Sequence, residues 1–461
     1  MHDSSFRRDN AKLLVLGAGL TGLSAAYHHP DGVVYEKEPL FGGHGKSHAS
    51  QGFIFDEGIH VVHTTDQAVL DLYKKVGVEF LVHQRDAWIR SFGALTRYPF
   101  QANTFGLPVD VVKDCLLGFI ENSSSDPEKI TNYEDSLYDM FGKGIAEHFM
   151  IPYAEKFWGV HPRELTTDWV DIRHPRPSLE DVIDGALGDQ KKGFGVNAEF
   201  RYPMKGGFGA IGDQFAKQIG DRLHLGKKVT KIDLENRCIE FNGTETVPYR
   251  HVISTIPLPE VIRCIPDAPD DVREAAAMLR TNSFFVVNLG VNREHISGKH
   301  WIYYLEKEYP FVRISFPSNF SADVAPSGTT AISAEIAYNV DTNPLTMSHK
   351  RMVERVIESL REEKILRSDD TIVFTDTIDI KYAYIIHDQN RVPAVRRIHD
   401  YLRKFDFYPC GRYGDWGYLW SHDAVLSGRD VALALKQGSI PHAPAGLCSQ
   451  EGCGCVGEFD V

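Results

Sequence analysis

The chain has 461 residues, which is too long for one simple core, so we expect two or more domains. Its 43% hydrophobic and 25% charged residues are typical of an ordinary soluble globular protein. The formal net charge of -13 argues against a nucleic-acid partner, because phosphate backbones need a basic surface. An anionic small molecule stays possible as a ligand, because a few local arginines can outweigh a distant negative field.

No apolar run approaches the roughly 18–20 residues that span a bilayer, and the first twelve residues lack the apolar core of a signal peptide. We therefore expect a cytoplasmic protein without a membrane span. Seven cysteines, an odd number, suit a reducing compartment. The three cysteines of residues 448–455 lack zinc-finger spacing, so we expect no metal site. Nothing in the composition indicates an oligomeric state.

The predicted elements change in character along the chain. The first 60 residues alternate short apolar strands with glycine turns, and residues from about 65 to 190 are expected to be mostly helical. Strand-like runs then follow at 228–234, 251–256, 283–291, 300–306, 311–316, 330–338 and 371–384. A turn and a helix over 425–438 come last.

This order predicts an α/β protein whose nucleotide-binding domain is discontinuous. We expect that domain to combine residues 1–75, 200–260 and 385–440. Residues 76–199 would form a mainly helical insert, residues 261–384 a β-rich substrate domain, and residues 441–461 a tail.

A dinucleotide motif stands at the first strand-to-helix turn, 17-GAGLTG-22. Gly17 permits the tight turn, Gly19 lets the backbone approach a pyrophosphate, and Gly22 lets the helix pack closely on the strand. Leu20, Thr21 and Gly22 would offer helix N-terminal N–H groups to the phosphates. Glu36 ends the second strand 19 residues after Gly17, beside Lys37, where ribose hydroxyls need an acceptor. The alternative is an ordinary strand–helix turn without a ligand.

A second glycine-rich loop, 42-GGHGKS-47, and the segment 53-FIFDEGIHVV-62 distinguish between dinucleotides. A simple NAD domain has no need of this loop, whereas FAD must pass its ribityl chain and second phosphate along such a backbone. We therefore expect FAD as the cofactor. The candidate residues that this loop and segment add are Gly43, His44, Ser47, Gly58 and His60.

These motifs resemble the flavoproteins that group amine oxidases, protoporphyrinogen oxidases, carotenoid desaturases and UDP-galactopyranose mutases. The segment 222–233 is similar to the strand of that group whose backbone meets adenine, which adds Val229, and the turn 411–414 adds Gly411 and Arg412. The resemblance covers residues 12 to 436. It implies a Rossmann-type FAD-binding domain, a helical insert and an antiparallel β-sheet substrate domain.

Several further stretches resemble UDP-galactopyranose mutases, above all the eukaryotic type. They are 97-RYPFQAN-103, 149–173, 193–211, 301–320, 382–388 and 411–418. The resemblance implies that Arg173, Arg313 and Arg412 stabilise a diphosphate and that His60 positions the flavin. It also implies substrate contacts from Tyr98, Phe100, Gln101, Trp158, Asn197, Tyr303, Tyr384 and Tyr418.

Plainer interpretations stay open for these residues. The segment 97–103 can be an aromatic turn on a core, Arg173 a surface ion pair, Asn197 a turn residue and Tyr384 a core residue. Arg313 lies in the apolar run FVRISF, where a charge is costly unless it is paired, and this favours a ligand role. We expect Trp416 to be a packing residue.

The chain departs from the mutases near the expected sugar. The mutase loop Gly-Gly-His is Gly58-Ile59-His60 here, and a branched residue cannot take glycine-only backbone angles. The leucine that follows the paired glycines is His44, and family asparagines are Ala154 and Gly193. These changes indicate a different sugar or different chemistry on it.

The resemblance implies that a UDP-sugar is interconverted between pyranose and furanose forms through a reduced-flavin N5 adduct, with NADPH as the expected reductant. The main alternative is an FAD-dependent oxidase or dehydrogenase acting on a sugar, an amine or another small substrate. A flavin-binding protein without catalysis is a third possibility.

Overall fold

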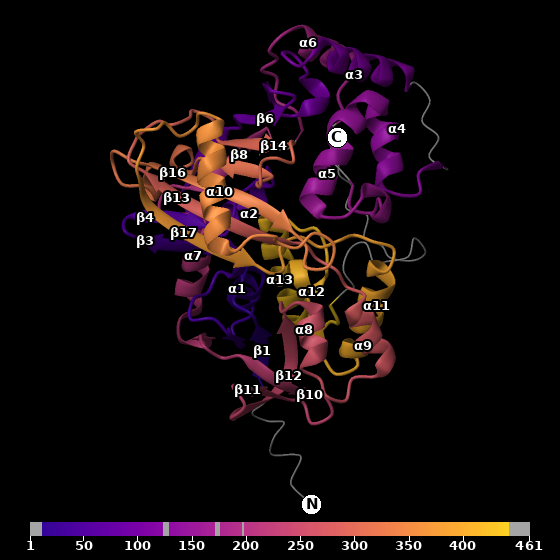
Figure 1. Cartoon of the computed structure of the whole chain (residues 1–461). Helices are drawn as coiled ribbons and strands as arrows, with labels where there is room; N and C mark the ends of the chain where they lie inside the picture. Colours follow the sequence, from indigo (N-terminus) through magenta and orange to yellow (C-terminus); the bar gives the residue numbers. More distant parts are fainter. Residues whose placement is uncertain (1–11, 123–128, 171–175, 196–197, 442–461) are drawn as a thin grey trace, which may run out of the picture.

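The computed structural model describes residues 12–122, 129–170, 176–195 and 198–441. Its elements form three regions along the long axis of the molecule (Figure 1). A sheet with flanking helices lies at one end, a second sheet lies in the middle, and a group of helices lies at the other end.

The first sheet carries the dinucleotide motif. Strand β1 (Lys12–Leu16) lies at its centre, parallel to β2 (Gly32–Tyr35) and to β12 (Glu245–Ser254). The outer strands are β9 (Leu223–His224), β10 (Val229–Asp233), β11 (Cys238–Phe241) and β18 (Phe407–Pro409). Apolar strands buried on both faces are typical of parallel sheets covered by helices, and β1 is buried over Leu13–Leu16. The sheet thus joins three stretches that are far apart in sequence.

Helices cover this sheet on both faces. They are α1 (Leu20–His28), α2 (Gln67–Val76), α7 (Ala210–Ile219), α8 (Leu258–Arg263), α9 (Asp270–Ala277), α11 (Arg391–Arg403), α12 (Gly411–Gly414) and α13 (Ser421–Lys436). The α/β class with a Rossmann-type sheet, predicted from the sequence, is confirmed. A short hairpin of β3 (Ser47–Ser50) and β4 (Phe53–Asp56) leads from the second glycine loop toward the middle sheet.

The second sheet is mostly antiparallel and has seven strands in the order β17-β13-β16-β15-β14-β6-β7. Their bounds are β17 (Ile372–Ile380), β13 (Ser283–Val291), β16 (Thr330–Tyr338), β15 (Arg313–Ser315), β14 (Trp301–Tyr304), β6 (Ala87–Ser91) and β7 (Ala94–Arg97). Helix α10 (His349–Glu362) packs on one face through Met352, Val356 and Leu360.

One expectation about the helical stretch is wrong. Residues 80–97 form strands β5 (Phe80–Gln84), β6 and β7 rather than helix. Strand β6 pairs with β14, and β5 pairs with β8 (Glu199–Pro203). The alternating burial of β6 is the two-residue period of a strand, and this short pattern is weak beside the longer helical stretches around it.

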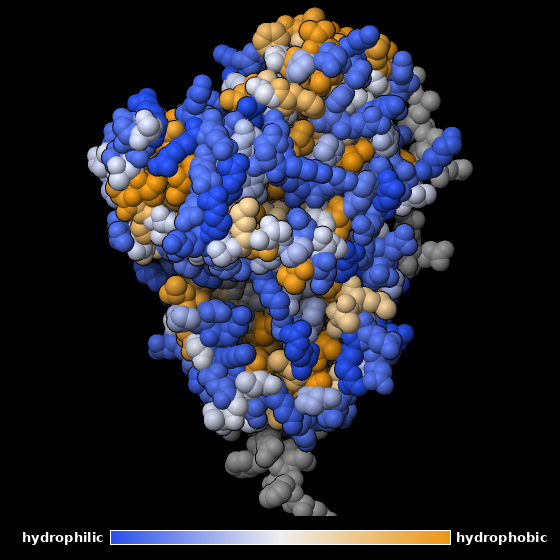
Figure 2. Space-filling view, viewed as in Figure 1, coloured by the Kyte–Doolittle hydropathy of each residue, from blue (hydrophilic) through white to orange (hydrophobic). Residues whose placement is uncertain are grey.

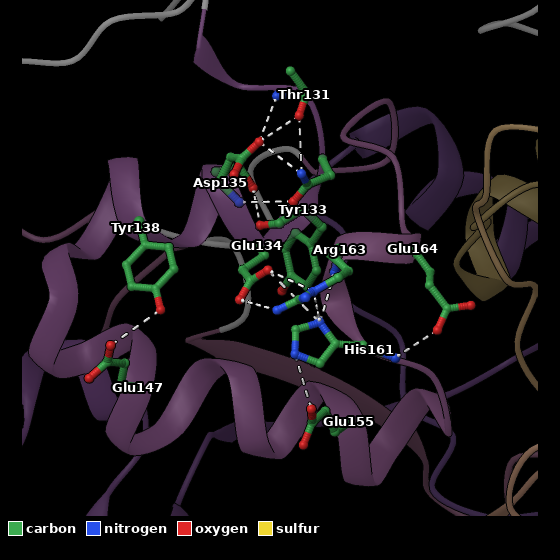
Figure 3. A network of polar contacts seen from close by, with 12 residues as sticks. Thr131, Tyr133, Glu134, Asp135, Tyr138, Glu147, Glu155, His161, Arg163 and Glu164 are labelled. Carbon is green, nitrogen blue, oxygen red and sulfur yellow. Dashed lines mark hydrogen bonds and ion pairs between the residues drawn. The ribbon is translucent and has the colours of Figure 1, made fainter.

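Helices α3 (Val109–Glu121), α4 (Tyr133–Ile145), α5 (Ile151–Trp158) and α6 (Leu179–Leu187) form the remaining region. Glycines allow α3 and α4 to touch, since a Cβ on Gly144 would lie 2.1 Å from the Asp114 carbonyl oxygen. A polar network joins α4, α5 and the 3-10 turn η5 (Pro162–Glu164) (Figure 3). In it the His161 ring lies 3.2 Å from Glu155, and Arg163 Nε lies 3.3 Å from Glu134. This network fixes the turn that follows Trp158.

Among the described residues, no helix is long and apolar enough to cross a membrane. Apolar side chains do reach the surface of the helical region, at the top of Figure 2. Those on α3 and α6 are Val109, Leu117, Ile120, Leu179, Ile183 and Leu187.

Candidate active site

The turn between β1 and α1 is too tight for side chains. A Cβ on Gly22 would lie 2.0 Å from the Gly17 carbonyl oxygen, and a Cβ on Gly17 would lie 2.3 Å from Thr255 Oγ1. Gly17 has a φ of +96°, which favours glycine. The first-turn N–H groups of α1, at Leu20, Thr21 and Gly22, have no partner within the helix and are available to an anion.

We call the turn between β1 and α1, with the residues packed around it, the cradle. Glu36 is its carboxylate. It is buried, and its oxygens accept hydrogen bonds from the N–H groups of Ala18 at 2.8 Å and Glu38 at 2.9 Å. The neighbouring Lys37 side chain is exposed and lies 3.3 Å from Glu38, so the structure does not bring it to Glu36. Val229 opens strand β10 and is partly buried at the edge of this sheet.

The second glycine loop lies directly against the first. The Gly42 N–H donates to the Ala18 carbonyl at 2.7 Å, and a Cβ on Gly43 would lie 2.9 Å from the Gly19 Cα. Ser47 donates to Asp56 at 2.6 Å and accepts from the Gly209 N–H at 2.7 Å. Ser47, the first residue of β3, therefore joins the hairpin to the start of α7.

The last helices close the cradle. A Cβ on Gly428 of α13 would lie 2.0 Å from the Thr21 carbonyl oxygen, and a Cβ on Gly411 would lie 2.4 Å from Thr21 Oγ1. Ser24 donates to the Val425 carbonyl at 2.7 Å. Two glycine loops, a helix N-terminus and a buried carboxylate in one place are the features that an FAD adenosine diphosphate requires, so the residues fit this cofactor.

A cavity lies where the cradle meets the second sheet. Five residues predicted from the sequence line it: His44, Gly58, His60, Tyr384 and Arg412. The other lining residues are Glu57, Ile59, Phe284, Val286, Glu335, Ile380, Ala383 and Tyr413. Burial raises the pKa of Tyr413 to about 12, and its hydroxyl donates to the Ala383 carbonyl at 3.2 Å.

Arg313 reaches this region from β15 and is paired with Glu335 of β16. The two side chains are 12% and 4% exposed, and Arg313 Nε donates to Glu335 Oε2. Burial alone would lower the pKa of the guanidinium, but Glu335 outweighs it and holds that pKa above its ordinary value. The predicted charge on a buried strand is therefore compensated by an acid on the neighbouring strand.

Glu335 also holds the loop 58–60. Its Oε1 accepts from the Ile59 N–H at 2.7 Å, and a Cβ on Gly58 would lie 2.6 Å from the same oxygen. Ile59 is not among the residues with a positive φ, so the branched side chain here needs no glycine-only conformation. Burial and the nearby His44 and Arg412 lower the pKa of His60 to about 4. The His60 ring is therefore neutral at pH 7.

The predicted tyrosines form two groups around the arginines. Arg412 lies over the rings of Tyr384 and Tyr418, 4.7 and 5.3 Å from their centroids. Arg313 lies 5.8 Å from the Tyr303 centroid, and Tyr303 lies 5.2 Å from Tyr98.

Trp158 joins the first of these groups, since its ring lies 5.9 Å from that of Tyr384. Five of the predicted substrate residues thus lie in these two aromatic groups.

Other predicted residues lie elsewhere. Phe100 is fully buried and stacks on Phe149 at 4.6 Å, so its ring belongs to the core of the helical region. Gln101 is buried beside it. Arg173 and Asn197 lie outside the described residues. Trp416, expected to be a packing residue, is completely buried.

The sequence interpretation missed two buried acids, Glu57 and Glu335. Burial alone would raise the pKa of Glu57, but hydrogen bonds from His44 and His48 and the charge of Lys46 hold it well below its usual range. Glu335 is the single charge in the apolar run 330-TAISAEIAY-338. The reasoning applied to Arg313 would have identified it.

Known proteins share this arrangement. The chain resembles a crystal structure of reduced UDP-galactopyranose mutase, with 27% identity, a TM-score of 0.87, and coverage of 93% of this chain and 94% of that one. It also matches protoporphyrinogen oxidase 2 of Arabidopsis thaliana, 22% identical over 54% of this chain and 57% of the relative. The protoporphyrinogen oxidase of Nicotiana tabacum is 24% identical, over 51% of this chain and 53% of the relative. The chain spans about half the length of these curated relatives.

The profile of the family described as flavin containing amine oxidoreductase matches residues 20–374. This match runs from the first turn of α1 to the start of β17, so it leaves out β1 and β18 of the first sheet. It includes the cavity residues His44 to His60, Phe284 and Glu335. The chain therefore belongs to the family of flavin-containing amine oxidoreductases, with FAD as its cofactor.

Proposed function

We propose that the protein is an FAD-dependent mutase that interconverts the pyranose and furanose forms of a UDP-sugar, with NADPH as its reductant. The observation that carries the proposal is the two guanidinium groups, Arg412 over the rings of Tyr384 and Tyr418 and Arg313 beside the ring of Tyr303. Two fixed cations beside a cofactor site suit a diphosphate, whose charge guanidinium forks match in a two-point geometry. The likeness to a reduced UDP-galactopyranose mutase supports the same activity.

The chain's own residues would bind and orient the substrate. Reduced FAD, when bound, supplies the covalent chemistry at the anomeric carbon of the sugar. Arg313 and Arg412 stabilise the leaving diphosphate, and each such charge-assisted contact is worth about 1.5–3 kcal/mol. The neutral His60 adds no charge to the cavity, and Arg412 is the cationic side chain of its lining, beside the Arg313–Glu335 pair. The tyrosine rings beneath them fix their direction.

The second candidate function is an oxidase or dehydrogenase, and the apolar side of the cavity favours it. Phe284, Val286, Ile380 and Ala383 line the wall formed by β13 and β17 and the segment after it. Such a wall suits a substrate with little polar surface. The curated relatives are oxidases of protoporphyrinogen.

One anaerobic experiment separates the two functions. The holoprotein is reduced with dithionite or NADPH and incubated with UDP-galactopyranose and other UDP-sugars, while chromatography follows the ring form and absorbance follows the flavin. A furanose product with the flavin still reduced supports the mutase. In a parallel anaerobic sample left oxidised, bleaching of the flavin by a substrate, without any change of ring form, would instead support the oxidase.

Binding of UDP tests the arginine pair directly. Arg313→Ala should weaken the affinity for UDP, measured by calorimetry, at least tenfold, since the lost contact is worth about 1.5–3 kcal/mol. Arg293→Ala is the matched control, because Arg293 pairs with the buried Asp370 at 2.7 Å and lies away from the cavity lining. Equal UDP affinity in the parent and Arg313→Ala would remove the diphosphate argument.

A further inference from the structure

His44 and Glu57 form a hydrogen-bonded pair in the wall of the cavity. Both residues line it, and His44 Nδ1 lies 2.7 Å from Glu57 Oε2. The Glu57 side chain is 6% exposed, whereas that of His44 is 35% exposed. The pair thus has a buried acidic end and an accessible imidazole end.

The other oxygen of Glu57 is occupied from the opposite side. Lys46 Nζ lies 2.6 Å and His48 Nε2 3.1 Å from Glu57 Oε1. These contacts leave Oε2 for His44 and fix the plane of the carboxylate. A carboxylate that is held in this way can fix the orientation and tautomer of a histidine.

The charge state of Glu57 determines that tautomer. Because the contacts of Glu57 lower its pKa well below its usual range, the carboxylate is ionised at neutral pH and can only accept. His44 must therefore carry a proton on Nδ1. Neutral His44 then has its lone pair on Nε2, which has no hydrogen-bond partner among the described residues.

His44 is also one of the positions at which this chain departs from the mutases, where a leucine follows the paired glycines. The other histidine of the cavity, His60, does not serve the same purpose. Burial, with His44 and Arg412 nearby, lowers the pKa of His60 to about 4, so its neutral ring is a weak base that accepts a proton poorly at neutral pH. His44 is thus the cavity histidine that geometry equips for proton transfer.

We propose that His44, oriented by Glu57, is a catalytic residue that moves a proton between two oxygens of the bound sugar. The inference rests on the proposed function. In ring contraction, Nε2 accepts the proton of the hydroxyl group whose oxygen forms the new ring bond. The same nitrogen returns that proton to the former ring oxygen, whose bond to carbon has broken. The imidazole has the same protonation state before and after the step, and no oxidant or reductant is consumed.

Several groups surround the pair and enter its pH dependence. From the two loops and the hairpin they are Lys46, His48, Glu57 and His60, and from the C-terminal segment they are Arg412 and Tyr413. Glu57 is anionic, and His60 and Tyr413 are neutral, across neutral pH. His48, held against Glu57 outside the cavity, is the second imidazole on this carboxylate and is therefore tested beside His44.

The test compares His44→Gln with His48→Gln in the reduced holoprotein. Each variant removes one imidazole partner of Glu57, but only His44 lines the cavity. His44→Gln should keep its flavin and its UDP affinity while kcat falls about 100- to 10,000-fold, as for loss of a general acid–base group. The kcat–pH profile of His44→Gln should differ in shape from that of the parent, because the variant lacks the cavity imidazole. His48→Gln should keep the profile of the parent.

Turnover of His44→Gln within threefold of the parent, or an unchanged pH profile, would overturn the proposal. NMR provides a readout apart from turnover, because the imidazole signal of His44, assigned by its loss in His44→Gln, can be titrated with and without UDP-galactopyranose. A midpoint that moves when the sugar binds supports contact with the ligand, and an unmoved midpoint contradicts it. If the parent shows no isomerase activity, the proposed function fails and the role of His44 fails with it. If the parent is an active isomerase and the His44 midpoint does not move, the proposal for His44 fails alone.

Discussion

Glu335→Gln should expose how much the buried Arg313 depends on its counter-charge. The Glu335 side chain is 4% exposed and that of Arg313 is 12% exposed. Glutamine keeps the shape and can still accept from the Ile59 N–H, which the carboxylate now holds at 2.7 Å. Glutamine cannot neutralise the guanidinium of Arg313. Its NH2 group would face the Arg313 Nε–H, so that one donor lies against another.

The expected cost follows from the burial of the pair. Removing one partner of a buried ion pair costs about 3–5 kcal/mol, because the remaining charge stays desolvated. At about 2 °C per kcal/mol for a unit of some 250 residues, the melting temperature should fall by about 6–10 °C. Scanning calorimetry of the FAD-loaded protein measures this fall.

Added UDP should restore part of the loss. Phosphate oxygens near Arg313 would supply the missing negative charge, so saturating UDP should raise the melting temperature of Glu335→Gln more than that of the parent. Asp370→Asn is the control, because Asp370 is 4% exposed and pairs with Arg293 away from the cavity. It should melt lower too, but gain no extra stabilisation from UDP. A Glu335→Gln protein that melts within about 1 °C of the parent, or equal UDP gains in both variants, would refute the reasoning.

Three further predictions concern the cradle and the cavity. Gly428→Ala places a Cβ 2.0 Å from the Thr21 carbonyl oxygen, so the purified protein should lose most of its flavin absorbance, whereas Gly188→Ala, which meets nothing within 4 Å, should keep it. Burial raises the pKa of Asp415 to about 7, so its native carboxyl holds a proton that the unfolded chain has lost, and stability falls as pH rises from about 4 to 7. Asp415→Asn should flatten this fall in urea denaturation, and an unchanged slope would contradict the assignment. Arg412→Lys keeps the charge but loses the planar contact with two tyrosine rings. UDP should therefore bind about fivefold to thirtyfold more weakly, a loss of about 1–2 kcal/mol. Unchanged UDP affinity in calorimetry would contradict this prediction.

Continuous apolar runs with clear ends were predicted closely from the sequence. The segments 283–291 and 330–338 coincide with β13 and β16, because continuous apolar runs with clear ends suit strands buried on both faces. Residues 80–97 were assigned wrongly, since strands of four or five residues pair with partners that are distant in sequence. Strand β6, for example, joins the second sheet by pairing with β14, which lies more than 200 residues later in the sequence.

The same distinction holds for the candidate site. His44, Gly58 and His60 lie in local motifs, and their place at the cavity could be predicted. The function of Glu335 depends on its contact with Ile59, 276 residues away in sequence, which no local pattern contains. The pairing of Glu57 with His44 likewise depends on how the hairpin returns to the glycine loop.

The contact between α1 and α13 has a consequence for biosynthesis. Ser24 and Val425, which hydrogen-bond across it, are 401 residues apart in sequence. At about 5–20 residues per second, translation separates their emergence from the ribosome by about 20–80 s. During that interval the glycine turn of α1 lacks the helix that closes over Thr21. Capture of FAD is therefore a late event, and a nascent chain must keep its first strand and helix from misassembling for most of its synthesis.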